Sequence, residues 1–144
     1  MLYYSLRIVH ILAMAVWFAA PLLITSDVRR SLGLGREHVG PMIARVDRAV
    51  TLAMGFGVLT VVTGVVLIFQ LGGFKAVHPR IHTSLLLGLV ALAVELMALK
   101  PAIARLSEPD AKPGKIAMFA GIGHLLKVVI LVLMVLRIEQ LGRG

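Results

Sequence analysis

The chain contains no cysteine, and this absence excludes several kinds of site. Disulfide bonds, thiolate-bound metals and iron–sulfur clusters all need cysteine sulfur. Any metal or cofactor must therefore be held by histidine, methionine or carboxylate side chains. Charge is also scarce, because charged residues make up only 15% of the 144 residues, against about a quarter in an average soluble domain.

The motifs of common hydrolases and nucleotide-binding enzymes are missing as well. The sequence has no glycine-rich phosphate loop, no HExxH motif and no serine with a histidine and an acid in a triad-like arrangement. Whether the protein is an enzyme is therefore left open. If it has an activity, we expect redox chemistry supplied by a bound cofactor.

Long apolar runs are abundant, with hydrophobic residues making up 59% of the chain. Four runs, at about residues 2–26, 49–71, 81–99 and 116–138, have the length of roughly 20 residues needed to cross a bilayer. Backbone polar groups in lipid must be satisfied within the segment, so each run predicts a helix. We expect residues 1–144 to form a single transmembrane domain, an all-α four-helix bundle with up-down-up-down topology.

The formal net charge of +8 indicates topology rather than a nucleic-acid partner. Nine basic residues lie in the first and third connections, and five lie at the opposite side of the expected bundle. This asymmetry predicts a multi-pass protein of the bacterial cytoplasmic membrane with both termini outside. The first run is expected to be retained and not cleaved as a signal peptide, because no positive charge precedes Arg7 and arginines follow the run.

Five ionisable side chains lie within the apolar runs, where polar groups are costly and usually have a role. They are His10, His82, Glu95, His124 and Lys127. His10 shares one helical stripe with Met14 and Trp17, one and two turns further on. A neutral imidazole in hydrocarbon needs a hydrogen-bond partner or a metal, and the sequence leaves both interpretations open.

Two histidines of this set could bind a metal together. The first and third helices both enter from the outer side and are diagonal partners in an up-down bundle, so His10 and His82 fall in the same half of the membrane. Diagonal helices leave room for a porphyrin between two axial imidazoles. His82 could instead reach the membrane interface, and His124 is then the reserve ligand. Met14 could complete a haem or copper site, or simply pack.

Glu95, His124 and Lys127 are expected at similar depths on the third and fourth helices. One interpretation is a charge-neutralising structural network, which we favour. The other is a proton relay, or a site for haem propionates or an anionic substrate.

The stretch "LRIVHILAMAVWFAAPLL" (residues 6–23) resembles the first helix of two related membrane families. These are the copper-resistance D (CopD) family and the HemJ-type protoporphyrinogen oxidases, which are four-helix proteins that bind a b-type haem. The resemblance implies that His10 is the haem-binding or metal-binding histidine. HemJ-type proteins also carry a lysine near the start of helix three that is tied to activity. The segment "RIHTSLLL" has none, so we do not expect porphyrinogen oxidation.

The leading hypothesis is a membrane protein that binds haem b for electron transfer or redox sensing. Its candidate cofactor-binding residues are His10, His82, His124, Met14 and Trp17, with His10 and His82 as the iron ligands. The alternatives are copper or small-cation transport through a His/Met site on the first helix, and a non-catalytic membrane subunit of a larger complex. The expected partners are the lipid bilayer, a redox partner such as a quinone, and further copies of the chain.

Overall fold

A computed structural model describes residues 1–108 and 111–141, and all regular elements in these ranges are helices. The long helices are α1 (Leu2–Leu34), α2 (Val39–Gln70), α3 (Pro79–Val94) and α5 (Pro113–Leu141). Four helical segments are long and apolar enough to cross a bilayer. The structure therefore confirms the predicted all-α four-helix bundle of a multi-pass membrane protein.

The third membrane-crossing segment is composite and longer than the predicted 81–99. After α3 it continues through a π-helical turn, η2 (Glu95–Leu99), then α4 (Lys100–Ala104) and a 3-10 turn, η3 (Arg105–Ser107). Pro101 lies two residues after the π-helical turn and cannot donate a backbone hydrogen bond to the preceding turn. The chain nevertheless stays on the bundle, because Ile103 and Leu106 are buried in the apolar core.

Helices α1 and α2 also extend beyond the apolar runs, and only Gly35 and the 3-10 turn η1 (Arg36–His38) lie between them. Val28 on α1 and Met42 and Val46 on α2 are buried in the same core cluster. Charged residues on the opposite faces pair across the two helices, since Arg45 Nη2 lies 3.0 Å from Asp27 Oδ1. A hydropathy average does not reveal this extension, because it combines the buried apolar residues with the charged residues on the exposed side of the helices.

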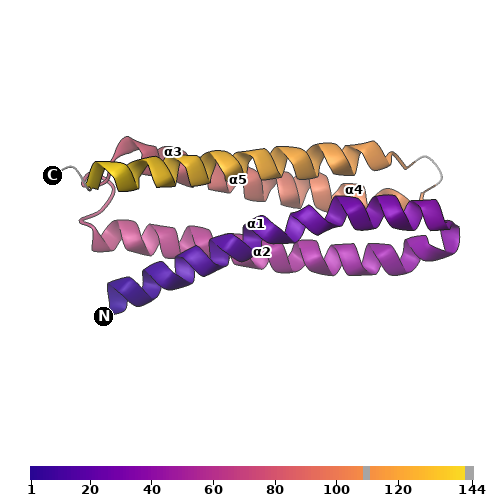
Figure 1. Cartoon of the computed structure of the whole chain (residues 1–144), viewed down its shortest axis with the longest axis horizontal. Coiled ribbons are helices and arrows are strands. Elements are labelled where there is room, and N and C mark those ends of the chain that lie inside the picture. Colours follow the sequence, from indigo (N-terminus) through magenta and orange to yellow (C-terminus); the bar gives the residue numbers. More distant parts are fainter. Residues whose placement is uncertain (109–110, 142–144) are drawn as a thin grey trace.

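The helices surround the core in the order α1, α2, α3, α5 (Figure 1). The first and third membrane-crossing segments are therefore diagonal, as predicted. Figure 1 also shows the N-terminal part of α1 crossing α2 and diverging from α5. Burial agrees with this view, because α1 has no buried residue before Ala13 and α5 has none from Leu131 to Val135.

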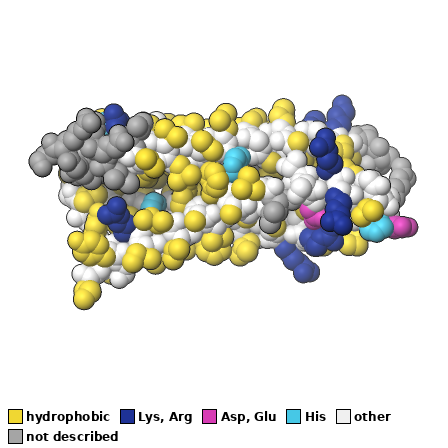
Figure 2. Space-filling view, in the orientation of Figure 1, with side chains coloured by type: hydrophobic (Ala, Val, Ile, Leu, Met, Phe, Trp, Pro, Cys, Tyr) yellow, Lys and Arg dark blue, Asp and Glu magenta, His cyan; other side chains and the backbone are white. Residues whose placement is uncertain are grey.

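The two ends of the bundle differ in charge. Lysine and arginine side chains gather at the end where α1 joins α2 (Figure 2); we call it the arginine end, and it includes Arg29, Arg30, Arg45, Arg48 and Lys100. We call the opposite end, which holds the N-terminus, the terminal end. The surface between them is rich in exposed apolar side chains, as expected for contact with lipid.

Candidate functional site

All four membrane-crossing segments meet near the middle of the bundle around three buried side chains. Trp17 of α1, Glu95 of the π turn and Lys127 of α5 are 1%, 2% and 0% exposed. We call these three residues the ion-pair cluster. Gly57 supplies the contact from α2, where its backbone lies against the indole of Trp17.

The polar groups of the ion-pair cluster satisfy one another. The Lys127 ammonium donates to Glu95 Oε1 and, at 3.0 Å, to the backbone carbonyl of Trp17. Trp17 Nε1 donates to the second carboxylate oxygen, Glu95 Oε2, at 2.8 Å. The ammonium also lies 4.7 Å from the centroid of a Trp17 ring, in range of a cation–π interaction. A buried salt bridge with these additional bonds is neutral overall and leaves neither charge alone in the hydrocarbon.

Pro21 explains why the Trp17 carbonyl is available. In a regular helix this carbonyl would accept a hydrogen bond from the N–H of the residue four positions later. That residue is Pro21, which lies inside α1 and has no N–H. The carbonyl left without its helical partner accepts the bond from Lys127 instead.

Gly57 makes room for the indole. A methyl group at this position would lie 2.7 Å from Trp17 Cε2 and 2.7 Å from Leu92 Cδ2. Cβ atoms in proteins essentially never make contacts this short, so a larger residue would displace Trp17 or Leu92. The glycine thus fixes how closely α2 approaches the ion-pair cluster.

His124 stays outside the ion-pair cluster although it precedes Lys127 by three residues. Its ring packs against Phe18, with the ring centroids 4.3 Å apart. Its Nδ1 atom is buried and has no hydrogen-bond partner among the described residues. Of the predicted Glu95–His124–Lys127 network, the structure brings together Glu95 and Lys127, and Trp17 supplies the third polar group.

His10 forms a second polar site, nearer the terminal end. Its Nδ1 lies 3.0 Å from Thr63 Oγ1. The Thr63 hydroxyl donates its own proton to backbone carbonyls of α2, the nearer being that of Leu59 at 2.7 Å. Thr63 must therefore accept from His10, and we assign the imidazole proton to Nδ1. In the neutral ring, Nε2 then carries a free lone pair.

Gly64 lies against the same imidazole. A methyl group at position 64 would come within 3.2 Å of His10 Cε1. The absence of a side chain therefore lets the His10 ring rest on α2, where Thr63 can fix its orientation. His10 remains only partly buried, in contrast to the ion-pair cluster.

The structure does not bring the three candidate histidines together. His82 is exposed and its ring centroid lies 5.8 Å from that of Phe74. Phe74 in turn contacts Phe69, which follows Gly64 by five residues, or about 8 Å along α2. His82 therefore lies closer to the terminal end than His10.

His124 is displaced in the other direction. Its neighbour Phe18 follows His10 by eight residues, or about 12 Å along α1. Within residues 1–108 and 111–141, no three histidine or carboxylate side chains converge as a metal-binding group. Ligation by His10, His82 or His124 stays a prediction.

Met14 and Trp17 share a buried apolar cluster with residues from the other three segments, namely Ala53, Ala91 and Ile130. Met14 is 8% exposed. Both side chains thus line the inner face of α1, as the stripe predicts. The indole N–H of Trp17 is used by Glu95.

The sequence analysis missed Pro21 and Thr63 as parts of these sites. Only Pro21 carries a local signal, because it lies four residues after a tryptophan inside an apolar helix. Comparison of the chain with family models, with curated proteins and with solved structures gives no match.

Proposed function

We propose that this protein binds a b-type haem within the membrane and that His10 would hold its iron through Nε2. The observation that carries the proposal is the fixed orientation of the His10 imidazole by Thr63. Ligand histidines in proteins almost always donate their other ring N–H to an acceptor, which fixes the tautomer and leaves one nitrogen for the metal. His10 has this arrangement inside a membrane-crossing helix.

The ligand set favours haem over a bare metal ion. A protein-bound copper or zinc ion takes most of its ligands from side chains, and the described residues contain no group of three histidine or carboxylate side chains that could hold one. A porphyrin brings four nitrogen ligands of its own, so one or two protein ligands are enough. The small Gly64 beside the imidazole and the divergence of α1 from α5 are consistent with a flat ring at this depth.

When bound, haem would supply one-electron redox chemistry, and the chain would hold and shield it. His10 would bind the iron and Thr63 would orient His10. His82 remains the proposed second ligand, with His124 in reserve, and Met14 and Trp17 would shield the inner side of the site. Electron transfer or redox sensing with a partner such as a quinone fits a bundle of this size.

The likeness of residues 6–23 to the CopD and HemJ-type families supports the same role for His10. By the positive-inside rule, the arginine end faces the cytoplasm of a bacterial cell and both termini lie outside. His10 would then lie in the outer half of the membrane.

The test is the absorption spectrum of protein purified from haem-supplied cells, together with a pyridine haemochrome assay. We expect a Soret band that His10→Ala abolishes. His38→Ala is the matched control, because His38 is exposed at the arginine end and should leave the spectrum unchanged. Folded protein that takes up no haem, or equal haem content in the His10→Ala variant, would overturn the proposal.

A further inference from the structure

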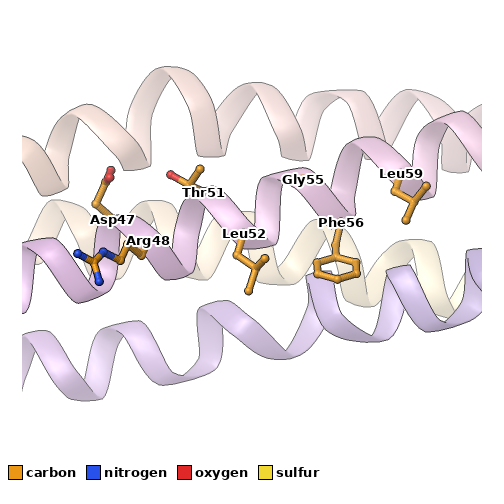
Figure 3. Close-up of a pocket in the computed structure, with 7 residues that line it drawn as sticks. All are labelled: Asp47, Arg48, Thr51, Leu52, Gly55, Phe56 and Leu59. Atoms are coloured by element: carbon orange, nitrogen blue, oxygen red, sulfur yellow. The ribbon is translucent and has the colours of Figure 1, made fainter.

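Two open grooves adjoin on α2 near the arginine end, each with a volume of about 610 Å³. The first follows α2 from Asp47 to Leu59 (Figure 3). The second lies between α1 and α2, and the two share Leu52. We refer to these two adjoining grooves together as the α2 groove.

The part of the α2 groove inside the membrane is apolar. Leu52 and Leu59 are 59% and 38% exposed, so a hydrocarbon ligand could contact them directly. Gly55 leaves the floor open, because a methyl group there would meet no atom within 4 Å. The hollow at this depth is therefore formed by the absence of a side chain at Gly55 and not by surrounding side chains.

The length of the α2 groove matches one leaflet of a bilayer. From Arg48 to Leu59 the helix rises about 16 Å, and half of the roughly 30 Å hydrocarbon core is about 15 Å. Figure 3 shows Arg48, Leu52 and Phe56 projecting from the same side of α2. A cationic group thus stands at one end of an apolar stripe that is as long as an acyl chain in its leaflet.

The charge at this end is positive after internal pairing. Asp27 is paired with Arg45 at 3.0 Å, and Asp47 lies 3.9 Å from Lys100. Arg48 makes no ion pair or side-chain hydrogen bond within the described part of the chain. Arg30, which lines the adjoining groove, acts on Asp27 only as a neighbouring charge.

We propose that the α2 groove is a binding site for an anionic phospholipid. The lipid phosphate would bind at Arg48, with Arg30 nearby, and one acyl chain would lie along Leu52, Gly55 and Phe56. Basic side chains beside an apolar groove at the membrane surface select anionic over zwitterionic head groups. The site is distinct from His10, which lies toward the opposite end of the bundle.

The test compares phosphatidylglycerol and phosphatidylcholine of identical acyl chains, bound to the purified full chain and counted as lipid adducts by native mass spectrometry. We expect preferential retention of phosphatidylglycerol. Arg48→Gln should reduce this preference about fivefold. The matched control is Arg7→Gln, which removes an exposed charge at the terminal end and should leave the preference intact.

A second pair of variants tests the acyl chain separately. Gly55→Leu should fill the groove and lower retention of both lipids, whereas Gly121→Leu, at an equally open glycine of α5, should not. Equal retention of the two lipids by the unaltered chain would overturn the proposal. Full displacement of phosphatidylglycerol by inorganic phosphate would also overturn it, since the site would then recognise phosphate alone. Haem content is expected to stay unchanged in all four variants, so the two proposals fail independently.

Discussion

The ion-pair cluster and the His10 site both place polar groups in hydrocarbon, but they differ in how completely those groups are hydrogen-bonded and buried. In the ion-pair cluster, the ammonium, the carboxylate and the indole N–H are each bonded and almost wholly buried. At His10 the imidazole makes one side-chain hydrogen bond, stays partly exposed and keeps a free ring nitrogen. A polar group whose bonds are all satisfied inside the protein joins helices, whereas one with a free lone pair is available to a ligand.

The largest expected effect comes from breaking the ion pair on one side only. Lys127→Met leaves the Glu95 carboxylate buried without its counter-charge, which should destabilise the bundle by about 3–5 kcal/mol. Adding Glu95→Gln removes the stranded charge and keeps an acceptor for Trp17, so the double variant should be much closer to the parent. The free energy of unfolding of both variants is measured by denaturant titration in detergent.

Lys115→Met is the control for that experiment, because Lys115 is exposed at the start of α5. A double variant as unstable as Lys127→Met alone would contradict the ion pair as the main stabilising contact of the cluster.

The second largest effect is expected from a substitution that disturbs the packing of the ion-pair cluster. Gly57→Ala puts a methyl group 2.7 Å from Trp17 and Leu92. We expect a loss of up to about 3 kcal/mol in the free energy of unfolding, as for other overpacked cores. Gly55→Ala, two residues away and facing open space, should be neutral or slightly stabilising. Equal stability of the two variants would show that the indole can move without cost.

At the His10 site, the expected effect falls on ligand binding and not on stability. Thr63→Val removes the acceptor that orients the imidazole, and should weaken haem binding about tenfold. Thr60→Val is the matched control, because the Thr60 hydroxyl donates to the Phe56 carbonyl of its own helix. Haem titration followed at the Soret band gives both affinities, and an equal loss in the two variants would argue against orientation by Thr63.

The smallest expected effect is the coupling between Pro21 and Lys127. Pro21→Ala restores an N–H that competes for the Trp17 carbonyl, so Lys127 should lose part of its contribution. In a double-mutant cycle of Pro21→Ala with Lys127→Met, we expect a coupling energy of about 1 kcal/mol, the value of one hydrogen bond. Strict additivity of the two substitutions would show that the freed carbonyl contributes nothing to lysine binding.

The sequence predicted the elements better than the contacts between them. Length and hydropathy located the four membrane-crossing segments, and short connections gave the diagonal placement of the first and third. The stripe of His10, Met14 and Trp17 correctly identified the inner face of α1. These features are determined by residues that are close together in the sequence, so a single sequence is enough to predict them.

Which polar side chains pair depends on how each helix is rotated relative to its neighbours. The sequence alone does not give this rotation. Glu95 and Lys127 were expected at similar depths, yet nothing local indicated that Trp17 would join them in preference to His124. The partnership of His10 with Thr63 likewise depends on the crossing of α1 and α2. The extended arginine end was missed because its buried residues are interspersed with charged ones.

The salt bridge between Glu95 and Lys127 also constrains how the protein is made. A lysine near the centre of a helix that enters the bilayer alone costs about 2.5–3.5 kcal/mol. Glu95, on the preceding membrane-crossing segment, carries a similar penalty. If the translocation machinery releases α3 and α5 together, the salt bridge forms as the two charges leave water, and their attraction offsets part of both penalties. In that case, stable insertion of α3 would depend on the arrival of α5, which carries Lys127.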